Sequence, residues 1–183
     1  MYLVGQQVLS LSLLLLAVGP AFPQDSQSAQ PSEYQLKAAF LYNFAKFVEW
    51  PPRAFAEDSS PVVIGIIGDN PFGENLERTV RNKFIGGHPI LVKTSVPPEE
   101  WKRCHILFVS NSENRRLREI MENLHGSAVL TVGETSRFID NGGVINFVIE
   151  GQKIRFEINR SAASEAGLKI SSKLLSLAAK TTP

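Results

Sequence analysis

Four short apolar segments, each bounded by residues typical of turns, constrain the fold of this chain most strongly. They lie at residues 62–67, 89–92, 105–109 and 128–132. Three of them lack the alternation of apolar and polar residues that marks a strand with one wet face, which predicts strands buried on both faces of a parallel sheet. Stretches of helical pattern separate these strands, at residues 72–82, 98–103 and 113–124. The sequence therefore predicts a single α/β domain with a mostly parallel, twisted, Rossmann-like sheet flanked by helices.

The last part of the chain follows a different pattern. Two extended runs, residues 144–150 and 153–159, are joined by Gly151-Gln152, a pair that favours a tight hairpin turn. Apolar residues alternate with charged or polar ones in the second run, so one face of that strand is expected to be wetter. These features predict a C-terminal antiparallel hairpin at the edge of the sheet. Two short helices are expected after it, over residues 160–166 and 171–179.

The N-terminal segment indicates export from the cytoplasm. Residues 1–24 contain no charged side chain, and residues 8–18 form an apolar run that is too short to span about 30 Å of hydrocarbon. The run fits the hydrophobic region of a secretory signal peptide with cleavage near residues 21–29, and an uncleaved anchor is the alternative. Residues 25–31 are polar and are predicted to form a linker, so the expected folded domain is 32–180.

A long amphipathic helix is predicted to open the domain. Ser32 and Gln35 form a capping-box pattern at its start, and two successive prolines prevent it from continuing past residue 50. Lys37 falls in the middle of the apolar arc, where it either pairs with Glu33 one turn earlier or contacts a partner or ligand. Trp50 either covers the core or anchors another protein. The candidate partner-binding residues are Lys37, Asn43, Lys46 and Trp50.

Polar residues follow three of the predicted strands at their carboxyl ends. Ligands of open parallel sheets bind at this edge, where loops and helix N-termini converge and favour an anion or a polar small molecule. The alternative is that several of these residues simply cap the following helices. The candidate ligand-binding crevice consists of Asp69, Asn70, Phe72, Ser110, Asn111, Gly133 and Glu134.

Several function classes lack support in the sequence. The chain has 19 basic and 18 acidic side chains, and therefore no basic excess of the kind that nucleic-acid binding needs. Its one cysteine, Cys104, excludes an intrachain disulfide and is expected to be buried in a strand. No residues show metal-ligand spacing or a cofactor motif, so neither a metal nor a cofactor is predicted. Ser110, His105 and Asp69 can be written as a triad, but no catalytic motif supports it, and no enzymatic activity is predicted.

The residues that open the domain, YQLKAAFLYNFAKFVEWP at 34–51, closely resemble the opening signature of the YfiR-like family of bacterial exported proteins. Other segments agree with this family in order and spacing, and the resemblance extends over about residues 32–180. These segments are IGDNPF at 67–72, CHILF at 104–108, GGVINF at 142–147, IRFEIN at 154–159 and AGLKISSKLL at 166–175.

The resemblance implies a periplasmic regulatory protein that binds and represses the periplasmic sensor domain of an inner-membrane diguanylate cyclase, which lowers cyclic di-GMP and limits biofilm. It also implies a homodimer. Because Cys104 has no second cysteine to pair with, the control by intrachain disulfides found in redox-tuned relatives is not expected. Two alternatives remain open: a regulator of a membrane histidine kinase, and a periplasmic protein that binds a small-molecule ligand in the crevice.

Overall fold

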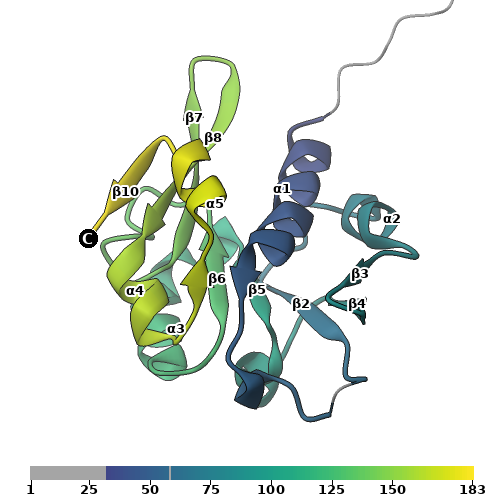
Figure 1. Ribbon diagram of the computed structural model, residues 1–183. Helices are drawn as coiled ribbons and strands as arrows, with labels where there is room; N and C mark the ends of the chain where they lie inside the picture. The colour runs from purple at the N-terminus through teal and green to yellow at the C-terminus, as the bar shows by residue number, and fades with distance from the viewer. Residues whose placement is uncertain (1–31, 58) are drawn as a thin grey trace, which may run out of the picture. The chain divides into compact units, whose positions relative to one another are not determined.

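The computed structural model describes residues 32–57 and 59–183, and an eight-stranded sheet forms its centre (Figure 1). Across this sheet the strands lie in the order β10-β8-β7-β6-β5-β2-β4-β3. The strands are β2 (Val62–Ile67), β3 (Phe84–Ile85), β4 (His88–Lys93), β5 (Ile106–Val109), β6 (Leu130–Gly133), β7 (Ile145–Glu150), β8 (Lys153–Asn159) and β10 (Lys180–Thr182). The neighbours from β4 through β7 run parallel, and the β7–β8 and β3–β4 pairs are antiparallel. The predicted mostly parallel α/β fold is therefore confirmed.

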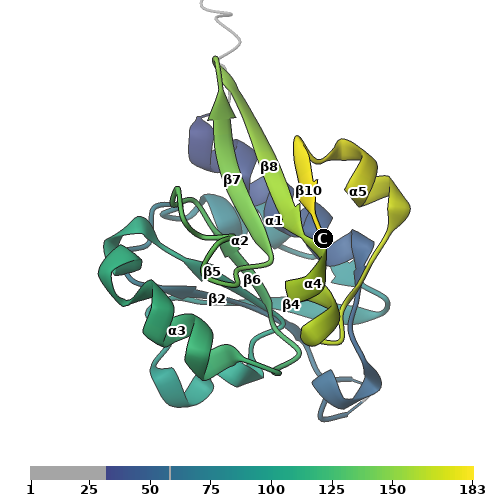
Figure 2. The ribbon, with the colours of Figure 1, turned by 90° about the vertical axis from the view of Figure 1, so that its left-hand side faces the viewer.

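Helices cover both faces of this sheet (Figure 2). The α-helices are α1 (Glu33–Phe47), α2 (Asn75–Val80), α3 (Leu117–Leu124), α4 (Arg160–Glu165) and α5 (Ser172–Leu177), and the 3-10 helices are η1 (Pro52–Ala54), η2 (Pro98–Arg103) and η3 (Asn111–Arg116). A separate pair of short strands, β1 (Val48–Glu49) and β9 (Lys169–Ile170), joins the end of α1 to the C-terminal part of the domain.

Two apolar cores fill the space between the helices and the sheet. Ile64 and Ile66 of β2 point into the core under α1, whereas Ile67 of the same strand belongs to the core under α3. The strands at the centre of the sheet are thus buried on both faces, which explains why their sequences do not alternate.

Helix α1 forms where the sequence places it. Ser32 Oγ accepts a hydrogen bond from the Gln35 N–H, and the Gln35 side chain accepts one from the Ser32 N–H, which completes the predicted capping box. Its aromatic residues pack on the β7–β8 hairpin: the Phe44 ring lies 5.1 Å from that of Phe156 and 5.7 Å from that of Phe147. Burial of these rings fixes the helix on the sheet.

Some element boundaries differ from the prediction. The helix expected over residues 72–82 is reduced to α2, which ends before Asn82, a residue with a positive φ of 57°. The last helix ends at Leu177 instead of 179, and the chain then forms β10 outside the hairpin, parallel to β8. The antiparallel hairpin is confirmed, and β10 adds a strand to the sheet beyond it.

Two glycines make room for the ring of Phe138, which is completely buried. A Cβ atom added at Gly133 would overlap one edge of this ring, and one added at Gly143 would overlap the other edge. Gly133 and Gly143 therefore have a packing role, because only a residue without a Cβ atom allows the ring to approach so closely.

Replacing Gly143 with alanine is expected to lower the free energy of unfolding by about 1–3 kcal/mol, because the ring has no free space to move into. Urea denaturation followed by circular dichroism measures this change. In the double variant Gly143→Ala/Phe138→Leu the smaller side chain should recover part of the loss. If the two changes add without recovery, the overlap with Phe138 is not the cause.

The predicted signal peptide 1–24 and linker 25–31 lie outside the described residues. Within the described ranges, no helix has both the length and the apolar character that a membrane crossing requires.

Candidate functional site

A cavity of about 510 Å³ lies where the start of α1 meets the carboxyl ends of β5 and β6 and the outer half of β7. Its lining combines charged, polar and apolar side chains. The residues are Glu33, Tyr34, Lys37, Asn111, Glu134, Thr135, Ser136, Asn146, Phe147, Val148 and Ile149. This is the edge of the sheet at which the sequence predicts a ligand-binding crevice.

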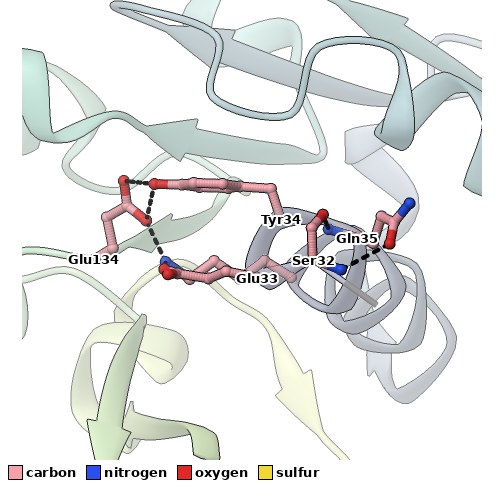
Figure 3. Close-up of polar contacts among 6 residues, drawn as sticks. Ser32, Glu33, Tyr34, Gln35 and Glu134 are labelled. Atoms are coloured by element: carbon pink, nitrogen blue, oxygen red, sulfur yellow. Dashed lines mark hydrogen bonds and ion pairs between the residues drawn. The ribbon is translucent and has the colours of Figure 1, made fainter. Parts of the chain in front are cut away.

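Lys37 and Glu134 form the polar centre of this cavity. The Tyr34 hydroxyl points to the carboxylate of Glu134 (Figure 3). The Lys37 ammonium donates to Glu134 Oε2 over 2.6 Å and also to Glu33 Oε1, and the side chain of Lys37 is only 4% exposed. The Tyr34 hydroxyl donates to both carboxylate oxygens of Glu134, over 3.3 and 3.4 Å. One ammonium thus pairs with two carboxylates, so the cluster of Glu33, Lys37 and Glu134 carries a formal net charge of −1.

The pKa values of this cluster reflect both burial and charge. Burial by itself would lower the pKa of Lys37, but the hydrogen bonds that its ammonium donates to Glu134 and Glu33 outweigh it and leave this pKa above its usual value. Burial and the nearby Glu134 charge raise the pKa of Tyr34. Both groups therefore keep their protons at neutral pH.

Two buried polar atoms in residues that line the cavity have no hydrogen-bond partner. They are Thr135 Oγ1 and Asn146 Oδ1, in residues that are 6% and 3% exposed. Buried polar groups are almost always paired, because an unpaired one loses its hydrogen bonds to water without replacement. Both atoms are also shielded from solvent, so a molecule in the cavity reaches them only if these side chains turn toward it.

The structure brings together residues that the sequence assigned to two separate groups. Lys37 comes from the predicted partner-binding set, and Asn111 and Glu134 come from the predicted crevice. Lys37 pairs with Glu33, as one interpretation expected, and also with Glu134, which lies 97 positions away in the chain. Tyr34, Thr135 and Asn146 were not among the predicted site residues.

The remaining crevice residues do not line this cavity. Asn70 Oδ1 accepts a hydrogen bond from the Phe72 N–H, and the Asp69 N–H donates to Ser112 Oγ, so both belong to the turn that follows β2. These bonds stabilise a turn rather than cap a helix, since neither α2 nor η3 has a side-chain cap. The other three crevice residues are buried: Phe72 and Ser110 in the domain interior, and Gly133 against Phe138.

The other predicted partner-binding residues lie further along α1. Asn43 and Lys46 are exposed on the helix, whereas Trp50 is half-buried and donates from Nε1 to the carbonyl oxygen of His105. Lys37 is enclosed by the carboxylates that it binds, so of this set Asn43 and Lys46 offer the most accessible side chains.

The structure does not form the Ser110–His105–Asp69 triad. His105 precedes β5 and Ser110 follows it, so the two lie at opposite ends of the strand. His105 Nδ1 instead accepts a hydrogen bond from the Val63 N–H. Among residues 32–57 and 59–183, no three His, Cys, Asp or Glu side chains are grouped as metal ligands.

Cys104 is buried, as predicted, but it lies between η2 and β5 instead of in a strand. Burial raises the pKa of its thiol to about 11. The thiolate is the reactive form, so the folded protein is expected to react with iodoacetamide at pH 7.5 far more slowly than the protein in 8 M urea. Mass spectrometry of both samples over time measures the difference. Equal rates would show that the segment before β5 opens readily and that Cys104 is accessible.

Comparisons with known proteins agree with this fold. A conserved domain protein from Vibrio cholerae O1 biovar eltor has a similar structure, with a TM-score of 0.56 and 12% sequence identity over 82% of this chain. An ABC domain in complex with L-Trp from Streptococcus pneumoniae has a TM-score of 0.52 and 11% identity over 81% of this chain. The present chain spans 60% of the length of each of these two proteins.

The family comparison is more specific. The model of the YfiR/HmsC-like family matches residues 34–179, which include α1 after its first residue, every cavity residue except Glu33, and the C-terminal hairpin. The match extends over most of the chain and agrees with the sequence segments that resemble this family. The protein therefore belongs to the YfiR/HmsC-like family.

Proposed function

We propose that this protein is a periplasmic regulator that binds the periplasmic sensor domain of an inner-membrane diguanylate cyclase and represses the enzyme, which lowers cyclic di-GMP. The family match over residues 34–179 carries this proposal. The YfiR/HmsC-like family is regulatory rather than catalytic, is periplasmic in general, and is associated with diguanylate cyclase signalling. Its members act through a signalling partner.

Repression by binding requires that the protein bind the inactive state of the cyclase more tightly than the active state. Equal affinity for the two states would shift nothing, however tight the complex. Asn43 and Lys46 are the candidate contact residues, because their side chains are exposed on the helix that opens the domain. Trp50 adds a half-buried ring at the end of this surface. We further propose export by the segment 1–24 and assembly as a homodimer.

The first test uses the full chain in its host. Deleting the gene is expected to raise cyclic di-GMP, measured by mass spectrometry of cell extracts, and a plasmid copy should restore the original level. Lys46→Glu should repress less than the wild type because it reverses an exposed charge of the proposed contact surface. Lys102→Glu makes the same change at an exposed residue of η2 and should repress like the wild type.

Two outcomes of this test would redirect the proposal. Unchanged cyclic di-GMP in the deletion strain would contradict repression of a cyclase. If a membrane histidine kinase then crosslinks to this protein, and if the phosphorylation of that kinase differs between the deletion strain and the wild type, the partner is the kinase instead.

The cavity supports a second candidate function, the binding of a small polar ligand as the regulatory signal or as the sole activity. The polar and charged lining of the cavity favours it, and the unpaired atoms of Thr135 and Asn146 would become available to a ligand if these side chains turn toward the cavity. A metabolite screen by thermal unfolding tests it: a ligand present at 100 times its Kd stabilises the protein by about 2.7 kcal/mol. The stabilisation should disappear in Thr135→Val. A screen without any stabilising compound would count against this function.

A further inference from the structure

The strand β7 has an unpaired backbone edge that faces the cavity. The last pair between β6 and β7 joins Gly133 with Asn146, after which the chain leaves the sheet at Glu134. β7 continues to Glu150, paired only with β8 (Figure 2). The sheet therefore has a gap beside residues 147–150, in the position that a longer β6 would occupy.

The phase of the β7–β8 ladder shows which backbone groups point into this gap. Asn159 N–H donates to the Val144 oxygen, which makes Val144 and Asn159 a hydrogen-bonded pair. In an antiparallel ladder such pairs alternate with non-bonded ones, so Val148 and Glu150 also direct their backbone groups to β8. Ile149 lies between them and directs its N–H and C=O away from β8, toward the gap.

The Ile149 backbone groups have no partner strand among the described residues, and its side chain is unusually exposed for an isoleucine, at 62%. Unpaired edges are normally shortened, covered or protected by charge, because another chain can add to them. The cavity beside this edge is about 510 Å³ in volume and is lined by Phe147, Val148 and Ile149 on the strand side. Four residues of an extended chain span about 13 Å, the length of the free part of β7.

The charges around the gap indicate what kind of segment would enter it. The lining holds Glu33 and Glu134 against Lys37, a formal surplus of one negative charge, and the Glu33 side chain is 43% exposed. Lys37 is already hydrogen-bonded to both carboxylates. An entering basic side chain would compensate the surplus, whereas an acidic one would be repelled.

We propose that the outer half of β7 is the docking edge for an extended segment of the partner protein, which adds to the sheet in line with β6 and places a lysine or arginine beside Glu33. Strand addition provides affinity through backbone hydrogen bonds, and the alternate side chains provide specificity. This inference rests on the proposed function, because it names the part of the regulator that holds its signalling partner.

A matched pair of proline variants tests this edge. Ile149→Pro removes the N–H that faces the gap without removing a bond to β8. Ile154 lies opposite Ile149 in the β7–β8 ladder, and its N–H points to the other edge of the hairpin. β10 pairs with β8 only at residues 157–159, so the Ile154 N–H faces no strand either. Ile154→Pro is therefore the control. Each full-length variant is expressed in the deletion strain at graded levels, with periplasmic amounts measured by immunoblot.

The concentration for half-maximal repression of cyclic di-GMP should rise about tenfold for Ile149→Pro, since a backbone bond is lost and the ring obstructs the added strand. It should stay at the wild-type value for Ile154→Pro.

Hydrogen exchange supplies a measurement that does not depend on how well a variant folds. The wild-type chain is mixed with the purified sensor domain of the cyclase that responds to the gene deletion, and peptides covering residues 147–150 and 153–156 are followed by mass spectrometry. Exchange at Ile149 should slow about tenfold in the complex, and exchange at Ile154 should not change. Glu33→Gln should weaken the protection.

The outcomes separate the two proposals. If the wild type represses and Ile149→Pro represses equally, or if Ile149 shows no protection in the complex, docking occurs elsewhere and this inference is wrong while the proposed function stands. If the wild type itself fails to lower cyclic di-GMP, the proposed function is wrong and the inference fails with it. Protection of Ile149 by a second copy of this chain alone, without the sensor domain, would assign the edge to self-association and overturn the proposed occupant.

Discussion

Replacing Lys37 with alanine is expected to lower the free energy of unfolding by about 3–5 kcal/mol, the usual effect of removing one partner from a buried ion pair. The variant leaves Glu134 without a counter-ion, although the side chain of that residue is only 10% exposed. A carboxylate in this position must either stay charged without compensation or take up a proton. Urea denaturation followed by circular dichroism at pH 7 measures the loss.

Two variants control for other effects of this substitution. Lys46→Ala removes an exposed lysine from the same helix, and it should change the free energy of unfolding by less than about 0.5 kcal/mol. The double variant Lys37→Met/Glu134→Leu removes both charges and should recover much of the loss, because an apolar pair can replace a buried ion pair at little cost. A loss in Lys37→Ala no larger than that in Lys46→Ala would show that water screens the pair.

The second large effect is a loss of stability at acidic pH that depends on His105. This side chain is 4% exposed, and burial, with a smaller contribution from His88, lowers its pKa to about 4, against about 6.5 in the unfolded chain. The hydrogen bond from the Val63 N–H to Nδ1 requires that nitrogen to be unprotonated. The unfolded state therefore binds the proton more tightly, and protonation favours unfolding.

Because the unfolded state binds the proton of His105 more tightly, the free energy of unfolding falls as the pH is lowered. The stabilisation is complete above pH 6.5 and is lost as the pH falls from 6.5 to about 4, by up to about 3 kcal/mol at 1.36 kcal/mol for each pH unit. Urea denaturation at intervals between pH 7 and pH 4 should show this slope. His105→Asn is the matched control, since an amide oxygen can accept the Val63 N–H but does not titrate. Parallel pH curves for the wild type and His105→Asn would contradict the prediction.

The sequence predicts the centre of the fold better than its edges. The runs that became β2 and β5 are apolar throughout because they are buried on both faces, so composition alone identifies them. β10 consists of Lys-Thr-Thr, which has no apolar signature. It forms because the chain after α5 returns to the free edge of β8, where the Ala179 N–H donates to the Phe156 oxygen. Contacts of this kind depend on the tertiary structure.

The candidate site was only partly predictable for the same reason. Helical spacing pairs Lys37 with Glu33, but nothing local connects Lys37 with Glu134. Of the site residues that were not predicted, Asn146 is the one that the sequence itself marks as a site candidate. It is a single amide within the apolar run of β7, and burying an amide costs free energy unless another group bonds to it. The roles of Gly133 and Gly143 depend on the position of the Phe138 ring, which no spacing in the sequence reveals.

The cavity and the free edge of β7 share residues, which suggests how a signal could act on the complex. Phe147, Val148 and Ile149 line the cavity on the strand side, and the Lys37–Glu134 pair lies within the same cavity. A small molecule bound there would compete with an added strand for the same space. Ligand binding and partner binding are therefore expected to be mutually exclusive, so that each lowers the affinity for the other.

Regulation by direct binding can be measured most directly in a reconstituted system. Membranes that contain the responding cyclase are supplied with GTP, and cyclic di-GMP is measured as the purified protein is added on the periplasmic side. Synthesis should fall with increasing protein and saturate, and the protein without the cyclase should leave GTP unchanged. Synthesis that stays constant at saturating protein would contradict regulation of the cyclase by direct binding.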